Sequence, residues 1–462
     1  MTKDYNFSYI LGITLVATLG GLLFGYDTAV ISGTVDSLNA FLITPNGLGK
    51  FALGSTVSSA LIGCIIGGIL SGFLSNRLGR KRTLLVAAML FFLSALGSGY
   101  PETLFFTYGK SSLGLLRMFN FYRIIGGIGV GLASAVSPMY IGEIAPASIR
   151  GRLVSWNQFA IIFGMLVVYF VNWGIAKGQT ETWINATGWR FMFISEAIPA
   201  GLFGLFILCV PETPRYLAMV NKEEKALNVL FKIMGDKLKA NQILLEIKET
   251  IVEKTKASIF SYGKTVIIIG ILLSVFQQFV GINVALYYAP VIFKSMGAAK
   301  DASMLQAVVM GLVNVVFTII AIMTVDKWGR KPLLITGSIG MAVGMFAISA
   351  LAFNNIIGTS TLVFIILYTG SFMMSWGPIC WVLISEIFPN KIRGQAVAIA
   401  VAAQWAANYL TSSTYPPMME VSGGLTYGFY GLMSVLSAIF VWKMVPETKG
   451  KTLEDMNKLW KK

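Results

Sequence analysis

Twelve apolar segments follow one another along the chain, and polar stretches separate them. A membrane-spanning helix needs about 20 mostly apolar residues, because its backbone has to cross a hydrocarbon core about 30 Å thick. The pattern therefore predicts an all-α membrane protein with twelve transmembrane helices. The predicted spans cover residues 9–33, 52–75, 84–100, 119–142, 153–175, 189–210, 264–293, 302–325, 333–353, 360–388, 395–415 and 424–445.

Composition agrees with this fold class and excludes several others. Of the 462 residues, 55% are hydrophobic and 12% are charged, whereas a soluble domain carries about 25% charged residues. The chain has no histidine, and its three cysteines lie apart inside apolar segments. A histidine-based triad, a metal site and a disulfide framework are therefore not expected. We expect a protein that is not an enzyme and that uses no cofactor.

Positive charge gathers in every second loop. The 36 Lys and Arg residues exceed the 21 Asp and Glu residues by 15, and most of them follow the even-numbered spans or lie in the C-terminal tail. Cytoplasmic loops of membrane proteins carry such an excess. We therefore predict that these loops and both termini are cytoplasmic. The same distribution explains the net charge without a nucleic-acid partner.

Three loop motifs occur twice, in the same order, and this internal repeat divides the chain. The copies are 250, 243 and 235 residues apart. They predict an N-terminal six-helix bundle (1–212), a cytoplasmic helical linker (213–259) and a C-terminal six-helix bundle with a short tail (260–462). The motif pairs are Asn76–Lys81 with Asp326–Lys331, Glu143–Gly151 with Glu386–Gly394, and Pro211–Thr213 with Pro446–Thr448.

Acidic and basic residues occupy matching positions of these repeated loops, on one predicted face of the membrane. Opposite charges at matched positions favour a cytoplasmic latch that holds the two halves together when the cavity opens outward. The alternative is that basic loops serve topology alone. The residues predicted for the latch are Arg80, Glu143, Arg150, Glu212, Arg330, Glu386, Arg393 and Glu447.

Three ionisable residues fall inside predicted spans, where charge is costly and is a functional candidate by default. Asp27 lies in span 1, Arg123 in span 4 and Glu196 in span 6. A carboxylate beside an arginine stays ionised until the pair separates, which is what a proton-coupled conformational switch requires. Because the chain lacks histidine, a carboxyl has to carry the proton. Asp27 with Arg123 is the stronger candidate for proton coupling. Of the three residues, Glu196 is the one that most favours a purely structural role.

A second set of buried polar residues is uncharged. Amides both donate and accept hydrogen bonds, as hydroxyl groups do, so several of them predict a pocket for a neutral, hydroxylated ligand. The alternative for each single amide is hydrogen bonding between helices. Gly281 with Pro290, and Gly377 with Pro378, interrupt spans 7 and 10, and interrupted helices point to the central site of a transporter. The residues are Gln158, Gln277, Gln278, Asn283 and Gln404, with Asn408 one helical turn from Gln404, and with Trp376, Trp381, Trp405, Phe24 and Phe372 as candidate faces for a ring.

Together these motifs resemble the sugar porters of the major facilitator superfamily over nearly the whole chain. The resemblance is carried by Gly25-Tyr26-Asp27, the two Arg-x-Gly-Arg-Lys-type loops, Pro211–Arg215, Gln277-Gln278 with Asn283, and Pro446–Gly450. It implies that the five amides and Trp381 bind sugar, and that Phe24, Tyr287 and Gly377 line the site. Met165 stands where xylose carriers have glutamine, and an apolar residue there resembles hexose carriers.

The resemblance implies import of a neutral monosaccharide together with a proton by alternating access, with D-xylose as the first expectation. Proton-coupled members have Asp at the position of Asp27, whereas passive animal glucose carriers have Asn. The alternatives are a passive uniporter and a membrane sugar sensor, although only 17 residues follow the last span. We expect a monomer in the bacterial inner membrane whose partners are sugar, proton and lipid.

Overall fold

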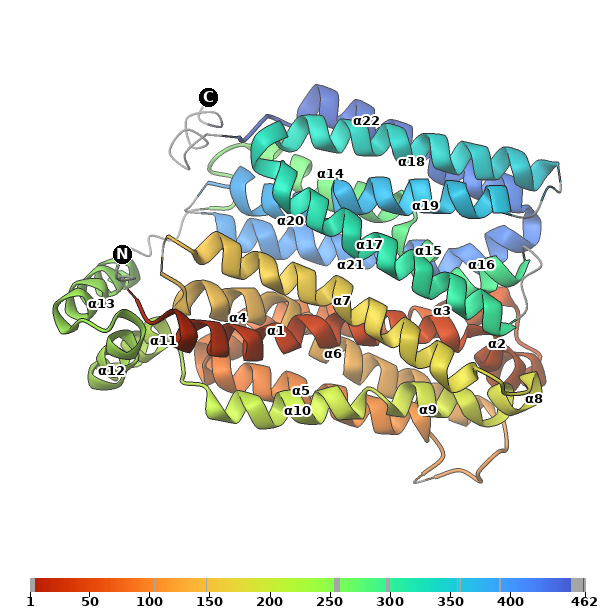
Figure 1. Cartoon of the computed structure of the whole chain (residues 1–462), viewed down its shortest axis with the longest axis horizontal. Coiled ribbons are helices and arrows are strands. Elements are labelled where there is room, and N and C mark those ends of the chain that lie inside the picture. The colour runs from red at the N-terminus through yellow and green to blue at the C-terminus, as the bar shows by residue number, and fades with distance from the viewer. Residues whose placement is uncertain are drawn as a thin grey trace.

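The computed structural model describes residues 5–103, 105–146, 148–252, 258–295, 300–354, 356, 359–389, 392–449 and 460. It is a bundle of long helices that run side by side, with the first half of the chain on one side and the second half on the other (Figure 1). The two-half, all-helical architecture expected from the sequence is therefore confirmed.

The first half begins with α1 (Phe7–Val30) and ends with α10 (Ala197–Cys209). Between them lie η1 (Ile31–Gly33), α2 (Val35–Leu38), η2 (Asn39–Ile43), η3 (Thr44–Asn46), α3 (Lys50–Val57), α4 (Ser59–Leu78), α5 (Arg80–Gly99), α6 (Leu113–Ile144), α7 (Arg150–Ala176), α8 (Glu181–Trp183), η4 (Ile184–Gly188) and α9 (Trp189–Ile194).

Three shorter helices follow, namely α11 (Pro214–Met219), α12 (Glu223–Met234) and α13 (Lys237–Val252). They pack on one another beyond one end of the bundle (Figure 1). The second half contains α14 (Lys264–Phe279), α15 (Ile282–Tyr287), α16 (Ala289–Ser295), α17 (Lys300–Trp328), α18 (Arg330–Phe353), α19 (Thr359–Met374), α20 (Trp376–Ile387), α21 (Arg393–Val421) and α22 (Gly423–Met444).

Each predicted span corresponds to one long helix or to a pair of helices in line. Among the described residues, eleven such segments are long and apolar enough to cross a membrane. The twelfth, α21, is not one of the eleven, and it carries the polar residues Gln404, Asn408 and Thr411 on its buried side. Two prolines inside this helix, Pro416 and Pro417, were not anticipated.

The helix pairs of the first half recur in the second. In the first half α1 packs on α7, α4 and α5 both pack on α6, and α10 packs on α5. In the second half α14 packs on α21, α17 and α18 both pack on α19, and α22 packs on α18. Between the halves α7 packs on α17, and α3 and α4 both pack on α21, so these contacts also correspond to each other.

Glycines set the spacing between α4 and α6. A Cβ at Gly63 or Gly67 would clash with the α6 backbone at Ile124 or Ile128, and a Cβ at Gly127 would clash with the carbonyl of Ala60. Small residues at such contacts let membrane helices approach closely. The glycine-rich run of α6 around Gly127 therefore serves helix packing.

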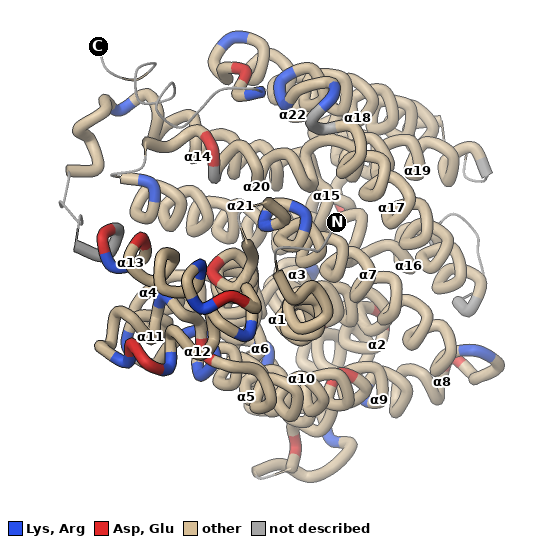
Figure 2. Tube along the Cα trace, turned by 60° about the vertical axis from the view of Figure 1, so that its left-hand side comes forward, with Lys and Arg blue, Asp and Glu red and all other residues tan. Residues whose placement is uncertain are grey.

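At the end of the bundle next to α11–α13, which we call the basic end, charged residues gather in the loops (Figure 2). In the first half Arg80 pairs with Glu143 at 2.9 Å, and the Thr213 hydroxyl donates to the same carboxylate. Glu212 accepts hydrogen bonds from the backbone N–H groups of Arg80 and Lys81, the first residues of α5. A carboxylate at a helix N-terminus is favourable because unpaired N–H groups and the helix dipole meet it there.

The second half repeats this cluster. Arg330 pairs with Glu386 at 3.0 Å, Thr448 donates to Glu386, and Glu447 accepts from the backbone N–H of Arg330 at the start of α18. Gly329, like Gly79 of the first half, has a positive φ, and a Cβ there would collide with the capping carboxylate. The three repeated motifs thus come together as one clamp in each half.

The residues predicted for the latch lie at the basic end in both halves. The acids and bases bind partners inside their own half in this conformation, and the Arg393 guanidinium donates to the Phe388 carbonyl. Arg150 is exposed at the start of α7. A latch that joins the halves when the opposite end opens stays a prediction.

Candidate functional site

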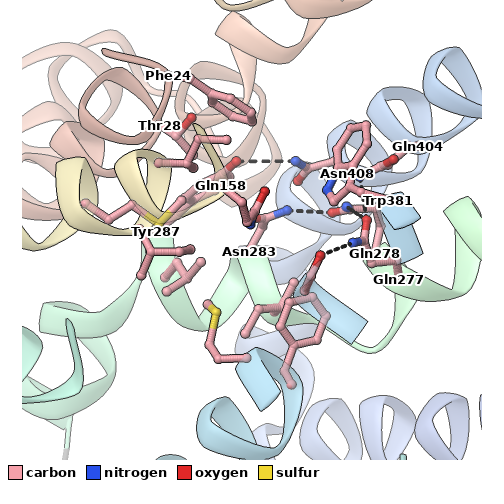
Figure 3. Close-up of a pocket in the computed structure, with 18 of the residues that line it drawn as sticks. Phe24, Thr28, Gln158, Gln277, Gln278, Asn283, Tyr287, Trp381, Gln404 and Asn408 are labelled. Atoms are coloured by element: carbon pink, nitrogen blue, oxygen red, sulfur yellow. Dashed lines mark hydrogen bonds between the residues drawn. The ribbon is translucent and has the colours of Figure 1, made fainter. Parts of the chain in front are cut away.

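A pocket lies between the halves, lined from one side by α1 and α7 and from the other by α14, α15, α19, α20 and α21. About 590 Å³ of space free of protein atoms lies in the pocket, part of it open to solvent. The pocket is lined by Phe24, Thr28, Gln158, Ile161, Ile162, Met165, Gln277, Gln278, Ile282, Asn283, Leu286, Tyr287, Phe372, Met373, Gly377, Trp381, Gln404, Trp405 and Asn408 (Figure 3). Every residue proposed from the sequence for the ligand site is among them, except Trp376.

Four amides form a continuous hydrogen-bonded chain on the second-half wall. Gln404 and Gln278 both donate to the Oε1 of Gln277, and the Asn283 amide donates to Gln278 Oε1 at 2.5 Å (Figure 3). Gln277 in turn donates to the Trp376 carbonyl at 3.0 Å. Each amide is therefore oriented by its neighbour.

A break in the helix makes this arrangement possible. Helix α14 ends at Phe279, and Gly281, at φ 90°, turns the chain into α15. This left-handed conformation is accessible to glycine at no steric cost. The turn places Asn283 beside Gln278, so the interruption predicted at Gly281 is confirmed. A second break comes at Tyr288, two residues before the predicted Pro290.

The break in span 10 lies at Ser375 rather than at Gly377-Pro378. Helix α19 ends at Met374 and α20 starts at Trp376, so Pro378 falls in the first turn of α20. Proline is tolerated there, because the N–H groups of the first turn have no partner within the helix. The offset moves the break but leaves Gly377 in the pocket lining.

Two of the three tryptophans proposed as sugar-facing surfaces line the pocket, and the third does not. Trp381 and Trp405 are lining residues, and the Trp405 ring lies 5.6 Å from that of Phe24. Trp376 is fully buried, and its indole N–H donates to Ser338 Oγ at 2.8 Å. That expectation was wrong for Trp376, whose side chain fixes α20 to α18.

Unpaired polar atoms belong to the same wall. Oε1 of Gln404 and Nε1 of Trp405 are buried without a hydrogen-bond partner among the described residues. A buried polar atom left unpaired costs free energy, so an acceptor and a donor are available to a ligand. Gln158 and Met165 reach the pocket from α7, where Met165 adds an apolar surface.

Sequence reasoning had no basis for some of the lining residues. Thr28 and the apolar side chains carry no distinctive motif. Asn408, which the sequence places one helical turn from Gln404, lines the pocket and donates to the Tyr287 hydroxyl at 3.3 Å.

The three ionisable residues of the spans also lie together. Arg123 donates to Asp27 Oδ1 at 2.6 Å, and both side chains are nearly inaccessible to solvent. Glu196 is fully buried and lies within electrostatic reach of both, and neither of its carboxylate oxygens has a hydrogen-bond partner among the described residues. Asp27 precedes Thr28 of the pocket on the same helix, so the charged cluster and the pocket share α1.

Away from the basic end, side chains bridge the two halves. Lys294 of α16 forms ion pairs with Asp36 at 3.3 Å and with Glu181 at 2.8 Å. Deeper in the bundle, the Tyr169 hydroxyl of α7 donates to the Leu286 carbonyl of α15 at 3.1 Å. These contacts close the end of the bundle opposite the basic end.

Twelve spans in two related halves, with broken helices around a polar pocket between them, define a secondary membrane transporter. The family model described as sugar (and other) transporter matches residues 13–460, and the chain belongs to this family. It is 55% identical to the D-xylose-proton symporter of Escherichia coli strain K12, over 100% of this chain and 97% of that protein. It is 40% identical to a glucose transport protein of a Synechocystis strain, over 98% and 97% of the two chains.

A solved structure agrees with the fold in detail. The inward-open conformation of the xylose transporter XylE from E. coli superposes with a TM-score of 0.89 at 53% sequence identity, covering 98% of this chain and all of that one. The protein is thus an integral membrane protein of the major facilitator superfamily.

Proposed function

We propose that this protein imports a neutral monosaccharide together with a proton. The observation that carries the proposal is the pocket between the halves, which combines a chain of four amides with two tryptophan faces and contains no charged side chain among its lining residues. Amides match hydroxyl groups as donors and acceptors. A neutral lining favours an uncharged ligand, because an ionised one would be desolvated without a counter-charge.

The Asp27 cluster supports proton coupling. Two carboxyls share one guanidinium, so one proton bound among them makes the cluster neutral and its loss leaves one negative charge. A net charge buried in the membrane is unfavourable, and protonation therefore changes the cost of any rearrangement that moves α1. Because α1 also carries Phe24 and Thr28 of the pocket, the proton and the sugar act on the same helix.

Transport then proceeds by rocking of the two halves. The contacts of Lys294 and Tyr169 support a state closed at one end, and the TM-score of 0.89 is to a relative captured inward open. We propose that the basic end faces the cytoplasm, because positively charged loops are retained there. The molecule is then inward open in the bacterial inner membrane, with both termini cytoplasmic.

D-xylose is the proposed first substrate, and the side chain at position 165 tunes the preference. Met165 presents an apolar, 7% exposed surface at the α7 wall, which suits the C6 group of a hexose better than an additional amide would. The complete pocket lies within one chain, so we propose that the protein works as a monomer without a resident cofactor. A passive uniporter is the alternative, and the Asp27–Arg123–Glu196 cluster argues against it.

The deciding experiment is Asp27→Asn in proteoliposomes. We expect the variant to lose sugar accumulation driven by a pH gradient while it retains exchange of labelled sugar across the membrane. Glu420→Gln, which changes an exposed acid outside the cluster, is the control and should keep accumulation. Accumulation by Asp27→Asn at the wild-type level would refute proton coupling through this residue. Loss of both accumulation and exchange would leave coupling to be judged from proton uptake on sugar addition to wild type.

A further inference from the structure

The loop between α5 and α6 leaves the bundle in an unusual direction. Apart from residue 104, which the structure does not describe, it runs from Tyr100 to Ser112 and extends sideways from the helices, across their axes, near the end opposite the basic end (Figures 1 and 2). A water-exposed connection would be free to project beyond the helix ends. This loop instead lies beside the flank that faces lipid.

The base of the loop is fixed by a buried ion pair. Arg190 of α9 donates to both carboxylate oxygens of Glu102, at 2.8 and 2.5 Å, and to the Gly99 carbonyl. Both charged side chains are at most 3% exposed. The guanidinium also lies over the rings of Trp189 and Tyr108, at 4.5 and 4.9 Å from their centroids. Removing one partner of such a buried pair is strongly destabilising, so the loop is held in place.

The tip of this fixed loop is aromatic and exposed. Phe105 is 71% exposed and Tyr108 is 61% exposed, whereas Phe106 between them turns inward and packs against the core. Lys110 follows them on the surface. Phe105 and Tyr108 therefore remain exposed, although a loop in water would be more stable with all three rings buried.

The lipid-facing surface continues up to this tip. On the helices that the loop connects, Leu93 is 53%, Leu113 is 49% and Phe121 is 54% exposed. Aromatic residues are enriched where a bilayer meets water, with Tyr presenting a polar tip and an apolar ring. A cation near such rings reaches the phosphate groups.

We propose that the loop Tyr100–Ser112 is an anchor in the phospholipid interface, with the ring of Phe105 inserted among the acyl chains just below the headgroups. The buried Glu102–Arg190 pair holds it there against the first half of the protein. The surrounding leaflet is the partner, and its chemistry is that of any glycerophospholipid interface. The anchor fixes the depth of the first half while the second half moves.

Spin labels test this placement. Phe105→Cys and Lys110→Cys are made in a chain whose Cys64, Cys209 and Cys380 are replaced, labelled, and reconstituted into vesicles of phosphatidylethanolamine and phosphatidylglycerol. Gln179→Cys, on the exposed loop after α7, is the matched control for water. The readout is relaxation by oxygen, which concentrates in lipid, against relaxation by a water-soluble nickel chelate.

We expect oxygen to dominate severalfold at position 105, the nickel chelate to dominate at position 179, and position 110 to lie between them. Nickel dominance at position 105 equal to that at 179 would place the tip in water and overturn the proposal. An immobilised label at 105 that neither reagent reaches would mean that a second protein surface covers it, which also overturns it. If Phe105→Cys does not fold, Tyr108→Cys takes its place with the same expected order.

Discussion

Lys294 gives a quantitative test of how the closed end is held. Its ammonium bridges to Asp36 and Glu181 of the other half, and the three side chains are 40%, 33% and 56% exposed. Exposed ion pairs contribute about 0.2–1 kcal/mol each, and one ammonium shared by two carboxylates gives a total of about 0.5–1.5 kcal/mol. Lys294→Ala should therefore shift the equilibrium towards opening of this end by roughly two- to twelvefold.

Protonation does not limit this contact near neutral pH. The hydrogen bond to Glu181 is the main reason that the pKa of Lys294 is raised. A raised pKa on a base means that its contribution is complete below the ordinary value and is lost only as pH rises through the raised one. The effect of Lys294→Ala should therefore be the same at pH 6 and pH 8, and it should shrink in concentrated salt, which screens exposed charges.

The assay is a distance measurement between spin labels at Gln179 in the first half and Val421 in the second, both exposed. Lys294→Ala should increase the longer-distance population, and 1 M salt should do the same to wild type. Lys177→Ala is the control, because its ammonium lies over Trp173 of the same half. An unchanged distance distribution in Lys294→Ala, or an equal change in the control, would refute the conclusion that the Lys294 ion pairs hold this end closed.

Three further results are expected. Gln278→Ala should weaken sugar binding at least tenfold, because it breaks the amide chain at two bonds, and calorimetry on purified protein that finds unchanged affinity would remove it from the site. Met165→Gln should raise affinity for xylose relative to glucose in a competition assay, and an unchanged ratio would show that this position does not select. Backbone N–H donors outweigh burial and lower the pKa of Glu447, whereas burial raises that of Glu212. Glu447→Gln should therefore lower the melting temperature at pH 7, and this loss should vanish as the pH falls through the lowered pKa. Glu212→Gln should lower the melting temperature less at pH 7. If the melting temperatures of the two variants depended on pH in the same way, this reasoning would be contradicted.

Hydrophobic length and internal repetition were enough to predict the spans and the two halves, because the bilayer thickness and the loop motifs are read directly from the chain. The pocket amides could be found for a related reason. An amide inside an apolar segment is conspicuous, and several on spans 5, 7 and 11 imply that these helices meet. Thr28 and Leu286 give no such signal, because threonine and leucine are ordinary residues of a membrane helix.

The spacing of the motifs in the sequence could not settle which acidic residue pairs with which basic residue. The sequence places Arg80, Glu143 and Glu212 at one membrane face, but it does not tell which helix ends touch there. The clamp forms because Glu212 caps α5 while Arg80 reaches α6, and this depends on packing inside one half. Trp376 was misplaced for a similar reason, since the break at Ser375 changes which side of α20 faces the pocket.

The amide chain of the pocket has a consequence for how firmly a sugar can be held. Gln277, Gln278, Asn283 and Gln404 already bind one another, and only the Oε1 of Gln404 is left over among their bonded groups. At the paired groups an arriving hydroxyl exchanges one hydrogen bond for another, so each exchange gains less than the roughly 0.5–1.5 kcal/mol of a new hydrogen bond. The amides therefore compete with the sugar for the same hydrogen-bonding groups. When the sugar leaves, the amides close on each other again, which lowers the barrier to release and suits a carrier that has to give up its cargo on every cycle.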